Sequence, residues 1–245
     1  MKTDFPAAHS MDTTWFAIDR DGHVAVFESG EAGAVPTEVA QSGGGYDEAE
    51  ALLQLPDQGA LVDLLGLRSM LTPEHDHATI DERTYEVTAF VRDPAAIEDL
   101  VRRMEARVYP ATTGSALVIR KPDPVGFAEL HNRGACVMCV RTFCSSRHAT
   151  HGVYDYSHSD RFENWIAGPY ARIAVPVKPI TADELPTVVL DVAIRFAGRF
   201  ADLVVLQPAE HWPSRAHSNM WVATDHKTHR DFETGEIVIY DEEDD

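Results

Sequence analysis

The chain has 245 residues, of which 44% are hydrophobic and 9% are aromatic, and this composition is sufficient to build a globular core. Its formal net charge is -19, from 40 acidic and 21 basic side chains. Nucleic-acid affinity comes largely from lysine and arginine side chains that displace counterions, so this charge argues against a nucleic-acid-binding protein. The sequence shows no secretion leader and no apolar run near the roughly 20 residues that span a bilayer, and we therefore expect a cytoplasmic protein with no membrane partner.

The first regular structure is predicted between residues 14 and 27. Residues 14–18 and 23–27 are apolar and strand-like, and Asp21 and Gly22 between them are typical of a tight turn. A β-hairpin is therefore expected here, after a flexible stretch at residues 1–11. Two short helices are expected next, near residues 47–55 and 58–70, because Pro56 separates two helical patterns.

From Tyr85 the pattern changes to strand, helix, strand. Residues 85–91 are strand-like, and Asp93 and Pro94 then provide an N-cap and a first helical residue. Apolar side chains follow with helical spacing up to Met104, and residues 116–119 return as a strand. We therefore predict a strand, a capped helix and a returning strand in this part of the chain.

A similar order begins at Ala171. Residues 171–177 are strand-like, with Pro176 favouring an edge position or a bulge. Residues 181–184 form a capping box, and apolar side chains then keep helical spacing up to Phe196. A further strand at residues 203–206 and a closing hairpin within residues 220–240 complete the prediction.

Together these elements predict an α+β fold, with a mixed or antiparallel sheet and helices packed on one side. We assign residues 12–240 to a single domain, with a candidate sub-boundary near residues 72–84. Residues 241–245 form an acidic tail, Asp-Glu-Glu-Asp-Asp. This tail fits either a frayed, solvating end or a docking segment for a basic partner.

All three cysteines lie in one window, at Cys136, Cys139 and Cys144, and two histidines follow at His148 and His151. Three thiolates and one imidazole are the ligand set of a closed tetrahedral zinc site. The candidate metal ligands are therefore Cys136, Cys139, Cys144 and His148, with His151 as a further candidate. Zinc is the only cofactor that the sequence suggests.

The same window also fits a buried strand, which we favour. Residues 135–140 are almost entirely apolar, and unpaired cysteine packs as a small hydrophobic side chain. In an extended strand Cys136 and Cys139 would point to opposite faces and would not share one ion without a turn. A third interpretation is a thiol nucleophile, with Cys144 and His148 one helical turn apart, but no orienting group can be identified for it. No catalytic residue can be assigned.

Residues 15–36, which read WFAIDRDGHVAVFESGEAGAVP, resemble the opening of a group of uncharacterised bacterial proteins. Residues 168–176 and 183–186 resemble a later segment of the same group. The resemblance implies a bacterial source, and it implies no activity, cofactor or site residue.

These observations predict a non-catalytic protein that presents an acidic surface to a partner protein with a basic surface. A toxin-neutralising immunity protein is the most concrete version of this hypothesis. The alternative is a zinc-binding protein or hydrolase that uses Cys136, Cys139, Cys144 and His148. A third hypothesis is an enzyme whose active site combines residues that are distant in sequence.

Overall fold

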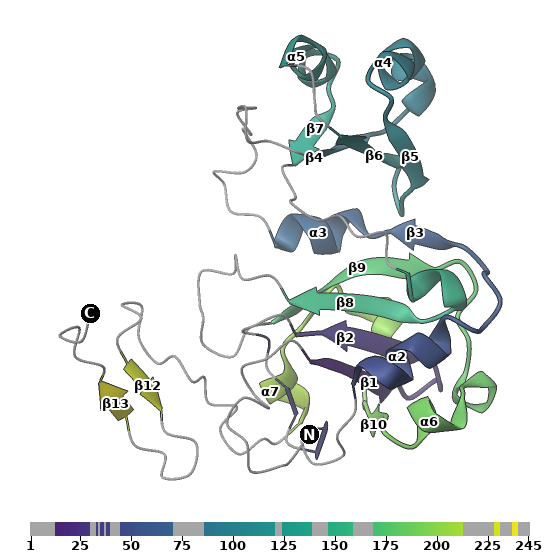
Figure 1. The fold of residues 1–245 in the computed structure, drawn as a ribbon, viewed down its shortest axis with the longest axis vertical. Coiled ribbons are helices and arrows are strands. Elements are labelled where there is room, and N and C mark those ends of the chain that lie inside the picture. The colour runs from purple at the N-terminus through teal and green to yellow at the C-terminus, as the bar shows by residue number, and fades with distance from the viewer. Residues whose placement is uncertain are drawn as a thin grey trace.

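The computed structural model describes residues 13–29, 33, 35–36, 38–39, 45–70, 86–120, 124–138, 147–158, 169–212, 228–230 and 237–239. These residues form a seven-stranded, a four-stranded and a two-stranded sheet, together with short helices (Figure 1). The predicted α+β fold with mixed or antiparallel sheets is confirmed. The N-terminal stretch, the sub-boundary near residues 72–84 and the acidic tail lie outside the described residues.

The predicted hairpin consists of β1 (Thr14–Ile18) and β2 (Val24–Glu28), which pair antiparallel along their whole length. Asp19 closes the turn, because its Oδ1 accepts a hydrogen bond from the backbone N–H of His23 at 2.8 Å. Gly22 has a φ of +85°, a conformation that side chains with a Cβ rarely adopt. The predicted turn at Gly22 is therefore confirmed, but the side chain that closes it is that of Asp19 and not that of Asp21.

The seven-stranded sheet has the order β10-β1-β2-β8-β9-β11, and β3 also pairs with β9. Its other strands are β3 (Ala60–Val62), β8 (Tyr154–His158), β9 (Tyr170–Pro176), β10 (Ile194–Arg195) and β11 (Val205–Leu206). The β1–β10 and β2–β8 pairs are parallel and the others are antiparallel, so the sheet is mixed. Because residues 13–70 and 147–212 supply neighbouring strands, we treat them together as the larger unit.

Each face of this sheet carries its own core, because successive side chains of β1 and β2 point to opposite faces. On one face the rings of Trp15 and Phe27 stack with centroids 3.9 Å apart. Six further buried aromatic side chains of this cluster are Tyr154, Tyr156, Tyr170, Phe196, Phe200 and Trp212. On the other face Phe16 and Val26 pack against residues of two helices, α2 (Tyr46–Leu52) and α6 (Thr187–Leu190).

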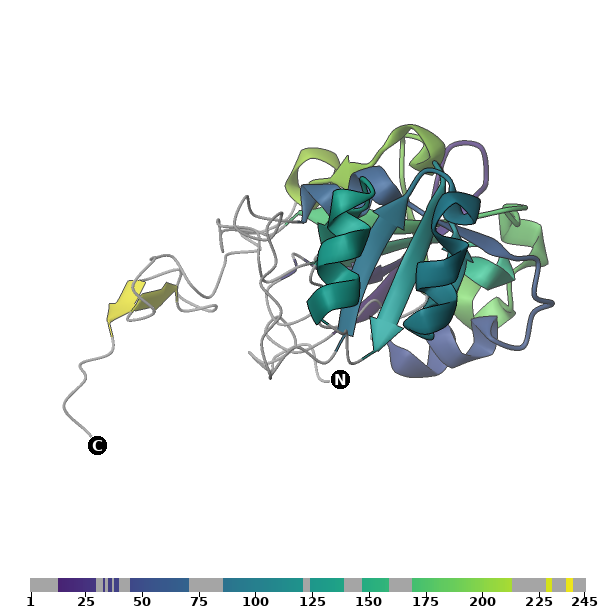
Figure 2. The ribbon, with the colours of Figure 1, turned by 90° about the horizontal axis from the view of Figure 1, so that it is seen from above.

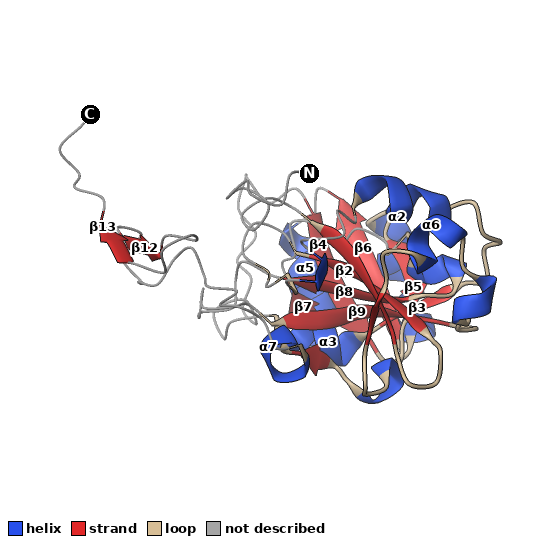
Figure 3. Ribbon diagram, turned by 90° about the horizontal axis from the view of Figure 1, so that it is seen from below, coloured by secondary structure: helices blue, strands red, loops and turns tan. Residues whose placement is uncertain are grey.

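The two faces also differ in their helices. α2 and α6 contact each other, and η5 (Ala182–Glu184), a 3-10 turn, precedes α6. α7 (Pro208–His211) and the 3-10 turn η6 (Phe200–Asp202) belong to the aromatic side, where Phe200 and Trp212 are buried. Figure 3 shows α2 and α6 at one side of the sheet and α7 at the other.

Residues 86–138 form the smaller unit, which has its own four-stranded sheet. Its elements are β4 (Glu86–Val91), η3 (Pro94–Ile97), α4 (Glu98–Arg103), β5 (Arg107–Pro110), β6 (Ser115–Arg120), α5 (Pro124–Asn132) and β7 (Cys136–Met138). The order is β5-β6-β4-β7, and every neighbouring pair is antiparallel. Each helix therefore joins two parallel strands that have another strand between them. This is the split βαβ topology of ferredoxin-like folds.

The predicted start of the first helix in this unit is confirmed. Asp93 Oδ1 accepts a hydrogen bond from the N–H of Ala95 at 3.0 Å, and Pro94 is the first residue of η3. The strand predicted at residues 116–119 is present, but it runs antiparallel to β4. The parallel return is made by β5, which was not predicted. α4 and α5 cover one face of the sheet (Figure 2).

The opposite face of the smaller unit's sheet rests on the larger unit. Phe90 and Val118 of the smaller unit pack with Val62 and Leu67 of the larger unit in one buried cluster. Leu67 belongs to α3 (Leu64–Ser69), and α3 lies between the two sheets in Figure 1. The contact is apolar, and it places α3 at the junction of the two units.

Two helix predictions are wrong in part. Residues 58–70 form β3 and then α3, because β3 pairs with β9 and the Asp63 side chain caps a new helix by accepting the N–H of Leu65 at 3.0 Å. The helix predicted up to Phe196 is shorter: Pro186 precedes α6, which ends at Leu190. Sheet pairing of β10 with β1 takes the following residues out of the helix.

Other outcomes concern the last strands. Pro176 is the final residue of β9, and β9 lies inside the sheet instead of at its edge. The predicted closing hairpin contains β12 (Thr228–Arg230) and β13 (Ile237–Ile239), which pair antiparallel. None of the described helices is long and apolar enough to cross a bilayer.

Candidate functional site

The predicted zinc cluster is only partly described. Cys136 lies in β7, so the strand predicted at residues 135–140 is confirmed for residues 136–138. Cys139 and Cys144 lie outside the described residues. Among the residues that the structure describes, no group of three or more His, Cys, Asp or Glu side chains is arranged to hold a metal ion. Zinc binding by this cluster stays a prediction.

His148 precedes η4 (Ala149–His151) and is buried beside the ends of two strands. Its Nδ1 lies 3.7 Å from Oε1 of Glu28 and 3.9 Å from Oδ2 of Asp155, and both distances exceed hydrogen-bond length. Burial lowers the pKa of His148 to about 4, and the neighbouring Arg147 guanidinium acts in the same direction. His148 is therefore a neutral, buried imidazole at pH 7.

His151 has a different environment from His148. Its Nδ1 lies 2.6 Å from the backbone carbonyl oxygen of Leu55, which follows α2. The backbone N–H of Gln58 donates to the carbonyl of Thr150 at 2.6 Å in the same region. These contacts fasten η4 to the end of α2, and a role of His151 as a further zinc ligand stays a prediction.

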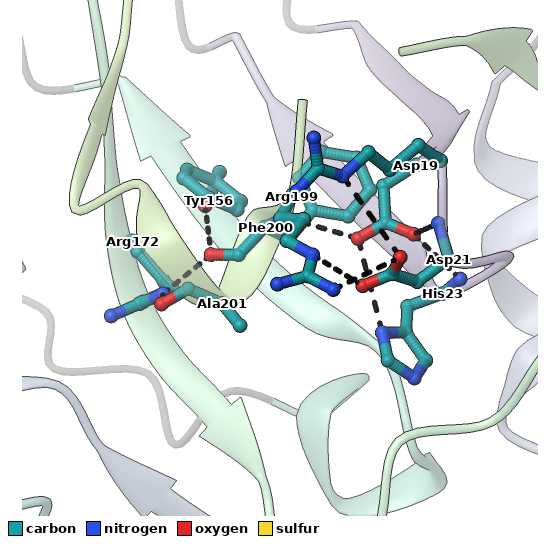
Figure 4. Close-up of polar contacts among 9 residues, drawn as sticks. Asp19, Asp21, His23, Tyr156, Arg172, Arg199, Phe200 and Ala201 are labelled. Carbon is teal, nitrogen blue, oxygen red and sulfur yellow. Dashed lines mark hydrogen bonds and ion pairs between the residues drawn. The ribbon is translucent and has the colours of Figure 1, made fainter. Parts of the chain in front are cut away.

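A second polar cluster lies around Arg172 in β9. Its Nε donates to Oδ2 of Asp63 at 2.6 Å, and both side chains are almost fully buried. Its Nη1 donates to the backbone carbonyl of Ala201 at 3.0 Å (Figure 4). A Cβ added to Gly66 would lie 1.7 Å from the carbonyl oxygen of Arg172, so α3 approaches β9 as closely as a backbone allows. The ion pair thus anchors α3 and η6 to β9.

The same network continues to the first hairpin. Oδ2 of Asp19 accepts the N–H of Phe200 at 3.1 Å, and Arg199 pairs with Asp21 at 2.7 Å (Figure 4). The hydroxyl of Tyr156 donates to the carbonyl of Leu203 at 2.6 Å, and burial raises its pKa. These groups are engaged with the backbone and with one another, and the network holds η6 in place.

The third feature is a surface, which we call the α2–α6 face. It is formed by residues 45–57, with α2, and residues 181–192, with η5 and α6. These two segments contain seven acidic side chains and no lysine or arginine. The acidic residues are Asp47, Glu48, Glu50, Asp57, Asp183, Glu184 and Asp191.

Some of these carboxylates also stabilise the local structure. Glu48 accepts the N–H of Gly45 and Glu184 accepts the N–H of Thr181, each at 3.0 Å. The hydroxyl of Thr181 donates to Asp183, which lowers the pKa of that carboxyl. The capping box predicted at residues 181–184 is therefore confirmed. The donors in these contacts are backbone N–H groups and a hydroxyl, so the capping adds no basic side chain to the face.

Sequence reasoning located the acidity in the C-terminal tail and missed the α2–α6 face. The segments are 123 residues apart, and they adjoin only because α2 and α6 pack on one side of the same sheet. Counting charges separately for each predicted helix would have drawn attention to them. The buried pair of Asp63 and Arg172 gave no signal, because its partners meet only through the pairing of β3 with β9.

No family model, curated protein or solved structure matches this chain.

Proposed function

We propose that this protein binds a partner protein with a basic surface, and that the α2–α6 face is the binding surface. The observation that carries the proposal is the absence of any basic side chain from two adjoining segments with seven acidic ones. Repulsion among like charges destabilises a compact fold, and a basic partner would relieve it. Complementary charge also accelerates association.

The larger unit gives this face a rigid support. Ala49 and Leu52 of α2 and Val189 of α6 are buried in the core that they share with β1 and β2. The backbone segments that carry the outward side chains are therefore held in place before a partner arrives. Preorganisation of this kind reduces the conformational entropy lost on binding.

Two charge-reversal variants test the proposal. E50K/D191K changes the α2–α6 face, and D202K/E210K changes two exposed carboxylates of η6 and α7, on the aromatic side of the sheet. Both variants alter the net charge of the chain equally. None of the four side chains makes a capping hydrogen bond within the described structure.

Each protein is used to capture partners from a lysate of the native host at low and at moderate salt. We expect wild type and D202K/E210K to retain the same stoichiometric partner, with less recovered as salt increases, and E50K/D191K to lose it. Equal recovery by all three proteins would contradict the proposal, and so would recovery that is independent of salt. An immunity-like role predicts in addition that the partner is a toxin whose activity the wild-type chain suppresses.

A further inference from the structure

The buried ion pair of Asp63 and Arg172 lies where α3 meets the sheet of the larger unit. Oδ1 of Asp63 caps α3 by accepting the N–H groups of Leu65 at 3.0 Å and Gly66 at 3.3 Å. Its Oδ2 accepts Nε of Arg172, and the two residues have exposed fractions of only 1% and 8%. Replacing a buried ion pair by apolar side chains often costs no stability, so stability alone does not explain this pair.

The guanidinium of Arg172 connects α3 to η6. Its Nη1 donates to the backbone carbonyl oxygens of Phe200 at 2.5 Å and Ala201 at 3.0 Å, both in η6 (Figure 4). A guanidinium is planar and rigid, so a shift of the Asp63 carboxylate also displaces the donor that η6 uses. The position of α3 and the position of η6 are therefore linked through one side chain.

η6 is bonded in turn to the first hairpin. The N–H of Phe200 donates to Oδ2 of Asp19 at 3.1 Å, and Oδ1 of the same carboxylate accepts the N–H of His23 at 2.8 Å. The ring of Phe200 is fully buried and stacks on Phe196, with ring centroids 5.0 Å apart. Movement of η6 would therefore disturb both the hairpin turn and the aromatic core.

At its other end this polar path reaches the smaller unit, because Val118 and Phe90 pack with Leu67 of α3 in one buried cluster. We propose that docking of the smaller unit on α3 is coupled, through Asp63 and Arg172, to the conformation of η6 and of the hairpin turn. Loosening of the docked unit then releases η6 and the turn together. Neither α2 nor α6 belongs to this device, so it is independent of the proposed function.

Amide hydrogen exchange of the full chain, followed by mass spectrometry, tests the coupling. Val118→Ala removes part of the cluster shared with α3, and Val87→Ala is the matched control, since Val87 is buried on the opposite face of the same sheet. We expect V118A to raise exchange at residues 64–69 and, by at least about fivefold, at residues 19–23 and 200–202. V87A should leave all of these segments as in wild type, and an equal increase in V87A would overturn the proposal.

The same substitution in a chain without the ion pair isolates the route. In D63L/R172M, V118A should still raise exchange in α3 but should no longer change it in η6 or the hairpin turn. If that double variant does not fold, D63N replaces it, because the amide keeps the capping acceptor and removes the negative charge. An equal effect of V118A on η6 with and without the ion pair would overturn the proposal. In the wild-type background, an increase confined to α3, or no increase in any of the segments, would also overturn it.

Discussion

The two units of this chain carry their charge in opposite ways. The smaller unit, residues 86–138, has seven acidic and seven basic side chains, whereas the rest of the chain has 33 acidic and 14 basic ones. On the helices of the smaller unit the charges pair, since Arg133 contacts both Asp99 and Glu129. The carboxylates of the α2–α6 face have no lysine or arginine in the same two segments. The net charge of -19 therefore comes from residues outside the smaller unit, and the larger unit, with 18 acidic and 8 basic side chains, supplies -10 of it.

The largest effect is expected from breaking the buried pair that anchors α3, on which the smaller unit rests. Asp63→Ala leaves the charge of Arg172 buried without its partner and removes the cap of α3. We expect the free energy of unfolding to fall by about 3–5 kcal/mol, measured by urea denaturation with tryptophan fluorescence.

A paired variant provides the control. Asp63→Leu combined with Arg172→Met removes both charges, so no buried charge is left alone, and it should lose less stability than Asp63→Ala. A change of less than 1 kcal/mol for Asp63→Ala would show that α3 is anchored mainly by its apolar contacts.

The next largest effect is on the pH dependence of the free energy of unfolding, and it arises within the larger unit. The pKa of His148 is about 4 in the folded protein and about 6.5 when unfolded, so the unfolded chain binds the proton more readily. Stability contributed by the neutral imidazole is present above pH 6.5 and is lost as the pH falls toward 4. The loss is at most about 3 kcal/mol. In the His148→Gln variant the urea midpoint should depend less on pH across this range than in wild type. An unchanged pH dependence would contradict the burial of a neutral His148.

A smaller change in the free energy of unfolding, an increase, is expected from a substitution at the junction of the units. Thr88 is fully buried in β4, and its hydroxyl has no hydrogen-bond partner in the described structure. Thr88→Val keeps the shape and removes the unsatisfied group, so the stability should increase by about 1 kcal/mol. Thr88→Ser keeps the hydroxyl and should give no increase. A destabilised Thr88→Val variant would indicate that the hydroxyl has a partner.

The smallest effect is expected where the charges are paired but exposed. Arg133→Gln removes contacts with Asp99 and Glu129 on the surface of the smaller unit. These contacts lower the pKa of both carboxyls and raise the pKa of Arg133. Solvent screens such pairs, and we expect no measurable change in the urea midpoint at moderate salt. A clear destabilisation would show that α4 and α5 depend on them.

Local chemistry explains which elements were predictable from the sequence. The turn at Gly22 and the helix start at Asp93 and Pro94 depend on contacts within a few residues in the chain, and both were read correctly, although Asp19 and not Asp21 closes the turn. Residues 58–70 were misread because their strand forms only by pairing with β9, more than a hundred residues away. Tertiary contacts override helical spacing in such a segment.

The split topology of residues 86–138 was missed for a related reason. β5 is a short strand with mostly exposed side chains, so its sequence lacks the apolar run that marks a buried strand. The candidate surface was missed because α2 and α6 adjoin only through the sheet that they cover. Of the predicted metal ligands, His148 and the further candidate His151 have described side chains, and their placement shows environments that spacing does not reveal.

The most direct measurement is the association rate of the captured partner as a function of ionic strength, compared for wild type, E50K/D191K and D202K/E210K. If the α2–α6 face steers the partner, wild type and D202K/E210K associate rapidly at low salt and slow steeply as salt increases, and E50K/D191K is at least about tenfold slower at low salt with a shallow dependence. Because both variants carry the same net charge, equal rates for E50K/D191K and D202K/E210K would contradict binding at this face.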